Sequence, residues 1–249
     1  MSRDAGVGLE VALKTTTPPF NDVRVRRAVF QSMNPWQAIQ DVWQGTAFVG
    51  LGFPPARADW LADEAQLRTY FGVADVARKL LRQAGTNTPL QVSIKVGDFG
   101  DRYQAHAQRI AEEMKAVGFE PTIEVVNRRA FAEDVWMGGD YQMFVGPIAP
   151  MTTPNSYLLT VLHSQGLWNT TQHQNEALDA LIEAQAQEFD DMTRKSLIQE
   201  IQLRAFENAY RFMPAASVSI WTWWPRVQNF YPNFAGFEYS HWVRVWLSE

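Results

Sequence analysis

The stretch from Leu90 to Ile148 constrains the fold of this chain more than any other part of it. Its apolar residues first alternate with polar ones, as in a strand with one buried face, and then recur at helical spacing as far as Gly118. A second strand pattern and a short helix pattern follow, and a third apolar run, Tyr141–Val145, reads as another strand. Strand, helix, strand, helix, strand in this order predicts an α/β fold whose sheet is built through right-handed crossovers.

Open sheets of this kind bind ligands beyond the carboxyl ends of their strands. The segment that leaves the third strand, residues 146–155, is therefore the first candidate for a ligand-binding lip. We expect Phe144, Pro147 and Ile148 to contribute to it.

Other elements are expected on both sides of this stretch. In chain order they are a strand at 9–13, a helix capped by Asn21 or Asp22, a helix that begins at Pro35, helices at 74–84, 178–189 and 192–210, and, after a break at Pro214, a strand at 216–220. The tail from Trp221 onward is rich in aromatic residues, and its prolines and glycine predict that it is irregular.

Composition excludes several function classes. With 249 residues the chain is long enough for a packed core, and its net charge of −5 without a long basic run argues against nucleic-acid binding. No apolar run is long enough to span a bilayer. The chain has no cysteine, so disulfides and thiol chemistry are ruled out.

Titratable residues do not form a recognisable catalytic or metal-binding motif. The four histidines, His106, His163, His173 and His241, are not spaced as metal ligands, and surface or capping roles are expected for them. The neighbouring acids at 112–113 and 190–191 look like solvated helix positions rather than a paired acid and base. We therefore expect no catalytic residues, no metal and no cofactor.

Ten tryptophans are the one anomaly of the composition, and an excess of this residue often lines a ligand groove. Trp168 beside Asn169 lies in a predicted loop and is a candidate contact for a solute. Trp221, Trp223 and Trp224 are further candidates, for which core packing against another part of the protein is the competing interpretation.

Several segments, in collinear order, are similar to one known family. They are residues 17–28 (TPPFNDVRVRRA), 77–85 (ARKLLRQAG), 109–118, 178–181 with Arg194 and Pro214, 236–237 and 245–246. Together they resemble the family 5 solute-binding proteins of ABC importers, the peptide- and nickel-binding group. The similarity covers almost the whole chain.

The resemblance implies a lobe of the type II periplasmic-binding-protein kind, with a mixed sheet flanked by helices. In this family two such lobes close on a solute, and the matched segments belong to the C-terminal lobe. We expect residues 1–220 to form that lobe and residues 221–249 to return toward an N-terminal lobe that is missing here. Met1 would then be an artificial or internal start.

The implied function is transport: the protein captures an oligosaccharide or a peptide-like solute and delivers it to a membrane permease. It would be periplasmic or extracytoplasmic, with a membrane-anchored lipoprotein as one option, and it would not be an enzyme. Self-association through the exposed inter-lobe face is also expected. The alternatives are a ligand-sensing domain of a regulator and, less favoured, a carbohydrate-active enzyme.

The sequence also departs from the family pattern. Where peptide binders of the family carry a tryptophan and then an aspartate that pairs with the amino group of the peptide, this chain aligns Pro147 and Pro150. Lys14 stands where an asparagine is frequent, and Val73 where an aspartate usually caps a helix. The first departure puts peptide binding through that contact in doubt, and the last predicts a weaker cap.

Overall fold

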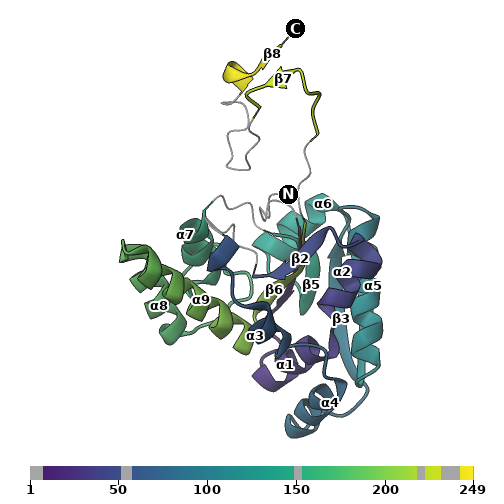
Figure 1. Ribbon diagram of the computed structural model, residues 1–249. Coiled ribbons are helices and arrows are strands. Elements are labelled where there is room, and N and C mark those ends of the chain that lie inside the picture. The colour runs from purple at the N-terminus through teal and green to yellow at the C-terminus, as the bar shows by residue number, and fades with distance from the viewer. Residues whose placement is uncertain (1–7, 52–57, 149–152, 218–221, 231–241, 249) are drawn as a thin grey trace.

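The computed structural model describes residues 8–51, 58–148, 153–217, 222–230 and 242–248. Within these residues, six strands form one mixed sheet in the order β2-β6-β1-β5-β3-β4, with helices around it (Figure 1). The strands are β1 (Gly8–Leu13), β2 (Ala47–Gly50), β3 (Leu90–Gly97), β4 (Phe119–Val126), β5 (Met143–Pro147) and β6 (Arg211–Ser217). β3 pairs in parallel with β4 and β5, whereas β1 pairs antiparallel with β5 and β6. The predicted mixed α/β sheet flanked by helices is confirmed.

Helices fill the connections between the strands. They are α1 (Val23–Ser32), α2 (Pro35–Trp43), the 3₁₀-helix η1 (Ala58–Trp60), α3 (Glu64–Arg68), α4 (Ala74–Gln83), α5 (Asp101–Lys115), α6 (Arg128–Ala130) continuing into the π-helix η2 (Phe131–Met137), α7 (Pro154–Tyr157) continuing into the π-helix η3 (Leu158–Leu162), α8 (Glu176–Gln187) and α9 (Asp191–Glu207). None of the helices in the described ranges is both long and apolar enough to cross a membrane.

The helix starts follow the capping residues seen in the sequence. The Asp22 side chain accepts a hydrogen bond from the Arg24 backbone N–H at 2.8 Å, and Asn34 accepts one from Gln37 at 3.2 Å directly before Pro35. Both satisfy backbone donors that a helix start would otherwise leave without a partner. Val73 offers no side-chain hydrogen bond to α4, as the sequence predicted.

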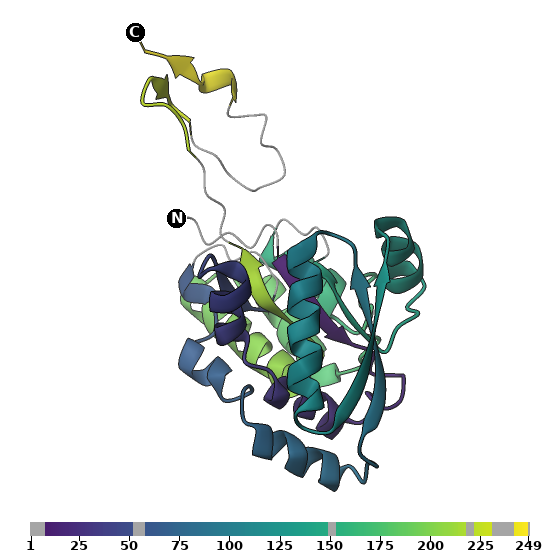
Figure 2. The same cartoon turned by 90° about the vertical axis from the view of Figure 1, so that its right-hand side faces the viewer.

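The central stretch folds as the periodicity predicts. The apolar stripe of α5, which includes Ala107, Ile110 and Met114, is buried, and α5 packs against β3 and β4. Figure 2 looks onto α5, which lies along the sheet. The two faces of β5 belong to different apolar clusters: Met143 and Val145 join the main core, and Phe144 packs on the other side.

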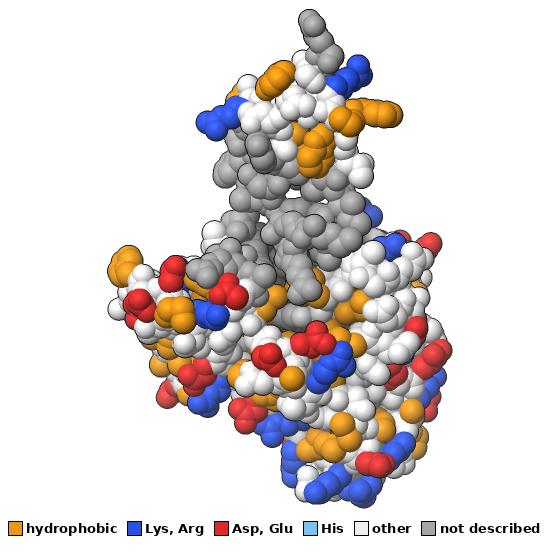
Figure 3. All heavy atoms as spheres, in the orientation of Figure 1, with side chains coloured by type: hydrophobic (Ala, Val, Ile, Leu, Met, Phe, Trp, Pro, Cys, Tyr) orange, Lys and Arg blue, Asp and Glu red, His pale blue; other side chains and the backbone are white. Residues whose placement is uncertain are grey.

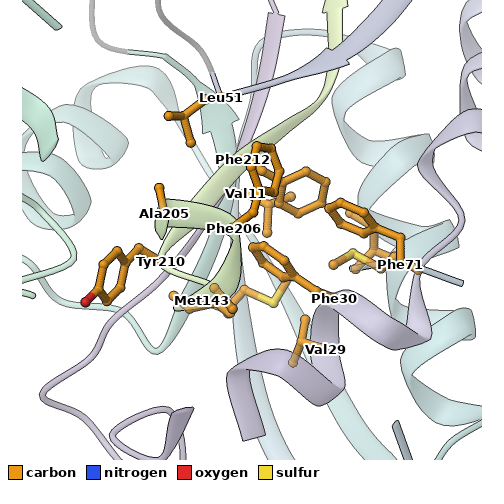
Figure 4. Close-up of a cluster of buried hydrophobic side chains, with 14 of the residues drawn as sticks. Val11, Val29, Phe30, Leu51, Phe71, Met143, Ala205, Phe206, Tyr210 and Phe212 are labelled. Atoms are coloured by element: carbon orange, nitrogen blue, oxygen red, sulfur yellow. The ribbon is translucent and has the colours of Figure 1, made fainter. Parts of the chain in front are cut away.

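The main core is built around a group of phenylalanine rings from four segments of the chain (Figure 4). The Phe30 ring lies 4.6 Å from that of Phe212 and 5.2 Å from that of Phe71, and the Phe206 ring lies 5.9 Å from that of Phe71. These contacts join α1, β6, α9 and the segment after α3, which are far apart in sequence. Burial of such large rings is a major stabilising term of the fold.

The last strand of the sheet begins earlier than predicted. β6 starts at Arg211 and includes Pro214, which the sequence analysis took as a break, and of the predicted strand at 216–220 the described residues end at Ser217. The register explains the difference: Leu9 pairs with Ala215 but Val11 pairs with Phe212, so β6 carries a bulge at Pro214. A bulge is where a central strand tolerates a residue without an N–H.

The predicted helix at 178–189 ends before its last apolar residue. α8 stops at Gln187, and the Phe189 side chain is 97% exposed in the turn to α9. The helical spacing of Phe189 misled the prediction, because the backbone of Glu188 is already extended and Asp190 caps the next helix, α9.

The aromatic tail contains a small hairpin. β7 (Val227–Gln228) pairs antiparallel with β8 (Trp246–Leu247), where the sequence predicted an irregular segment. Figures 1 and 2 both show this hairpin standing apart from the main sheet and its helices.

Candidate functional site

One edge of the sheet collects the ends of all six strands of the main body. β3, β4, β5 and β6 finish there, and β1 and β2 begin there, because Gly97 pairs with Val126, Leu9 with Pro147 and Ala47 with Ser217. We call it the carboxyl edge. Loops at such an edge of an open α/β sheet are where ligands bind. It is therefore the candidate functional site.

Aromatic rings pack directly beneath this edge. A Cβ atom added to Gly146 would lie 2.1 Å from Cζ of Phe131, and one added to Gly97 would lie 2.5 Å from Cε2 of Phe99. Both glycines are needed because a ring lies against their backbone. The Phe99 and Phe131 rings are 5.7 Å apart, edge to face, so the ends of β3 and β5 lie on packed aromatic rings.

Two arginines lie over aromatic rings at the same edge. The Arg128 guanidinium is 5.3 Å from the Phe99 ring centre, and its Nε donates to the backbone oxygen of Asp98 at 3.2 Å. The Arg102 guanidinium, in the first turn of α5, is 5.4 Å from the ring of Trp43. Stacked guanidinium groups with free N–H donors can bind a carboxylate or another anionic group.

Of the predicted contact residues, Pro147 and Ile148 lie at this edge. Ile148 is 8% exposed and packs against Met213 and Ala216. Phe144 lies deeper in β5, with its side chain fully buried beside Ala12 and Phe131.

The structure does not bring Trp168 and Asn169 to the carboxyl edge. Their loop lies at the opposite end of β1, where the N–H of Thr15 donates to the Thr171 oxygen at 2.9 Å. The Asn169 amide donates to the backbone oxygens of Ser164 and His173, at 3.1 and 2.9 Å, and so braces its own loop.

Trp168 is partly buried and meets Trp136 edge to face, with ring centres 5.6 Å apart. Trp136 was not singled out from the sequence, because it falls inside a helical pattern rather than in a loop.

The remaining predicted contacts belong to the tail. Trp221 lies outside the described residues. Trp223 and Trp224 lie next to β7, are 49% and 74% exposed, and stand apart from the carboxyl edge with the hairpin (Figure 1). The Trp223 ring contacts Phe230 at 5.1 Å.

The interpretation of the histidines as surface or capping residues is wrong for two of them. His106 and His173 are both 1% exposed. His106 Nδ1 accepts a hydrogen bond from the indole N–H of Trp43 at 3.1 Å, and burial lowers the pKa of His106 to about 4. His173 stacks on Tyr210 at 4.2 Å, and burial lowers the pKa of His173 to about 4.

In the part of the chain that the structure describes, no group of three or more histidine, aspartate or glutamate side chains is arranged to hold a metal ion. His163 lies near Glu183, at 3.2 Å, and His241 is outside the described residues.

Comparison with known proteins identifies the family. The profile of the bacterial extracellular solute-binding proteins, family 5 (middle), matches residues 3–169. This chain belongs to that family. The resemblance seen in the sequence is confirmed, and the family is one of substrate-binding proteins.

Individual relatives agree with this assignment. The di/tripeptide-binding protein 3 of Pseudomonas aeruginosa (strain UCBPP-PA14) is 24% identical over 199 residues, which are 77% of this chain and 37% of that protein. The periplasmic binding protein DppA of Helicobacter pylori, solved with the peptide STSA, is 19% identical with a TM-score of 0.78 over 99% of this chain and 48% of its own. An oligopeptide-binding protein of Thermotoga maritima, solved with mannohexaose, is 17% identical with a TM-score of 0.70 over 88% of this chain and 47% of its own. The chain thus spans about half of these solved proteins and less of the curated relative.

Proposed function

We propose that this chain forms one lobe of the substrate-binding component of an ABC importer. The whole component would capture a solute between two lobes and deliver it to a membrane permease. The observation that carries the proposal is the carboxyl edge: six strand ends meet there in a member of a solute-binding family, and the chain spans about half of its solved relatives. An open edge of this kind is suited to close on a solute held by a second lobe.

A peptide-like solute is the first choice for the cargo. The curated relative is named a di/tripeptide-binding protein, and one solved relative holds a peptide. Arg102 and Arg128 supply guanidinium groups at the edge that would pair with a terminal carboxylate. The amino end would need another partner, because the sequence has no carboxylate from Tyr141 to Pro154.

An oligosaccharide is the second choice. One solved relative holds mannohexaose, and sugar rings stack well on tryptophan. Trp221, Trp223 and Trp224 are the side chains that we propose for such contacts. Trp168 and Asn169, which the sequence also suggested, lie at the opposite end of β1 from the carboxyl edge and would not take part.

Contacts at the carboxyl edge would come first from Pro147 and Ile148. Phe144, buried below them, would support the floor of the site rather than touch the solute. No bond would be made or broken, so affinity would come from desolvated contacts and a few placed hydrogen bonds.

The tail and the location of the protein belong to the same proposal. Residues 221–249 would pack on the second lobe, which would cover the exposed tryptophans of the hairpin.

The full-length protein would act outside the cytoplasm, in the periplasm or as an anchored lipoprotein. A ligand-sensing domain of a regulator and a carbohydrate-active enzyme remain the alternatives.

Titration calorimetry tests the proposal. The full-length protein that contains this chain should bind a di- or tripeptide, or a mannooligosaccharide, at one site, whereas this chain alone should bind weakly because half of the cleft is absent. Arg128→Gln in the full-length protein should weaken a peptide with a free carboxylate and leave its amidated form unchanged. Tight one-to-one binding by the chain alone, or hydrolysis of the sugar, would contradict the proposal.

A further inference from the structure

The sheet has an open lateral margin at β2. β2 pairs with β6 on one side, and on its other side no strand of the described chain pairs with it. A groove of about 670 Å³ runs along this strand, lined by Ala47, Phe48 and Val49. Three consecutive strand residues line the groove, so its floor is the strand edge itself.

Two further segments of the chain line this groove beside the strand. One comes from α2 and includes Trp36 and Gln40, and the other is the segment Leu61–Arg68. Half-buried apolar side chains such as Trp36 and Leu61 therefore flank a row of backbone groups with which no described strand pairs. Such a row, left unpaired, is a ready template for another strand.

The charges of the groove cancel each other. Arg68 and Glu64 form an ion pair at 2.7 Å, and the Arg68 guanidinium lies 4.2 Å above the ring of Trp36. The other polar residues of the lining, Asn34, Gln37 and Gln40, are uncharged. The groove therefore offers no net charge to attract an acidic or a basic segment.

The shape of the groove limits what kind of chain can bind in it. The segments that line the groove beside β2 leave less room for the edge of a folded sheet, such as β2 of a second copy, than for a single chain. A single extended chain can enter, and it would match the four residues of β2 over about 14 Å. Strand addition of this kind takes its affinity from backbone hydrogen bonds and its selectivity from alternate side chains.

We propose that the β2 groove is a second peptide site, which binds a free, extended, uncharged peptide as an added strand. Its apolar side chains, at alternate positions, would rest on Trp36 and Leu61. The site lies on the lateral margin of the sheet, not at the carboxyl edge, and does not depend on the function proposed for that edge.

Backbone pairing can be tested directly with this chain by ¹⁵N–¹H NMR. The probe is a hexapeptide of alternating valine and serine with both ends blocked, compared with two forms that are N-methylated at alternate residues, one for each edge of the strand. We expect shifts centred on residues 47–50, and binding weakened about tenfold by one methylated form but not by the other. Equal binding of all three peptides, or shifts centred on Gly97 and Gly146, would overturn the proposal.

A matched pair of variants tests the groove itself. Gln40→Trp fills the groove from an exposed position of α2, and Gln108→Trp places the same ring at an exposed position of α5, outside it. Gln40→Trp should weaken the blocked peptide about tenfold and Gln108→Trp should not. The proposal would be overturned if both variants weakened the peptide equally. It would also be overturned if Gln40→Trp changed the sedimentation coefficient, because a second copy would then be the occupant of the groove.

The peptide site at the β2 groove and the solute site at the carboxyl edge can be tested independently of each other. The blocked peptide has no free terminus for the arginines of the carboxyl edge, so its binding reports on the β2 groove alone. Solute binding by the full-length protein with Gln40→Trp reports on the carboxyl edge alone.

Discussion

Arg211 and Glu10 form an ion pair in which both side chains are 2% exposed and the Nη1 and Oε1 atoms are 3.0 Å apart. The pair joins β6 to β1 in the middle of the sheet, and Nη2 of Arg211 donates to the Thr170 hydroxyl at 2.9 Å. Burial raises the pKa of the Glu10 carboxyl, against the attraction of the Arg211 guanidinium. Within the described structure the Arg211 Nε is also buried and has no hydrogen-bond partner. Removing both charges from water therefore costs free energy, and each buried charge is stabilised by the other.

Glu10→Gln should lower the free energy of unfolding by about 3–5 kcal/mol, because it leaves the buried charge of Arg211 uncompensated. Urea denaturation measures this loss. The double variant Glu10→Gln with Arg211→Met removes the charge as well, so it should recover part of the stability.

An exposed ion pair supplies the control. Glu200 and Arg204 are one turn apart on α9, each about half exposed, with 3.2 Å between charged atoms. Glu200→Gln should change the free energy of unfolding by no more than about 1 kcal/mol. Similar losses for Glu10→Gln and Glu200→Gln would show that burial does not set the importance of the pair.

His106 should make the chain less stable in mild acid. Its pKa is about 4 in the folded chain because it is buried, and about 6.5 when unfolded. Between these values the unfolded chain binds a proton that the folded chain does not. The free energy of unfolding should therefore fall by about 3 kcal/mol as the pH drops from about 6.5 to about 4.

The variant His106→Gln isolates this effect. Glutamine can still accept the hydrogen bond from the Trp43 indole, but it does not titrate. Urea denaturation at pH 7 and at pH 4.5 should show a smaller loss for the variant than for the parent chain. His173, whose pKa is also about 4, contributes to the pH dependence of stability in the variant as it does in the parent chain. Identical losses would mean that His106 is not the titrating group.

Val73 marks a helix start that can be improved. It precedes α4, is 45% exposed and gives no side-chain hydrogen bond to the first turn, whereas Asp22 caps α1 in this way. Val73→Ser should be more stable than Val73→Ala by about 1 kcal/mol in urea denaturation. The comparison of the two variants cancels the loss of the valine side chain. Equal stability would mean that the serine hydroxyl does not reach the helix.

Local patterns predicted the elements whose boundaries depend on local chemistry. The α5 stripe through Ile110, the Asp22 cap and the strand–helix–strand order could all be read from spacing and side-chain type. The edge that we take as the candidate site could also be located from the sequence, because its position depends only on where the strands of the α/β pattern end. Arg128 could have been found in the same way, because it comes two residues after the end of β4.

The features that the sequence did not reveal depend on partners that are distant along the chain. Pro214 lies in β6 at a bulge in its pairing with β1, and the buried His106 accepts a hydrogen bond from Trp43, 63 residues earlier. Trp168 was placed near a ligand because loops are usually exposed, yet Trp136 covers part of its ring. Spacing along one segment carries no information about such pairs.

The hairpin of β7 and β8 should drive self-association of this chain. It carries exposed apolar side chains, among them Trp224 and Val243, which are 74% and 84% exposed. Exposed apolar patches of this kind favour association. The double variant Trp224→Ser with Val243→Ser should shift sedimentation velocity toward the monomer without changing the free energy of unfolding of the main body, from which the hairpin stands apart (Figure 1). Figure 3 shows apolar side chains, in orange, on the surface of this part of the chain. Phe189→Ser is the matched control, since Phe189 is 97% exposed on the α8–α9 turn. If Phe189→Ser has the same effect, association is a general result of exposed apolar residues, and the hairpin is not a specific contact surface.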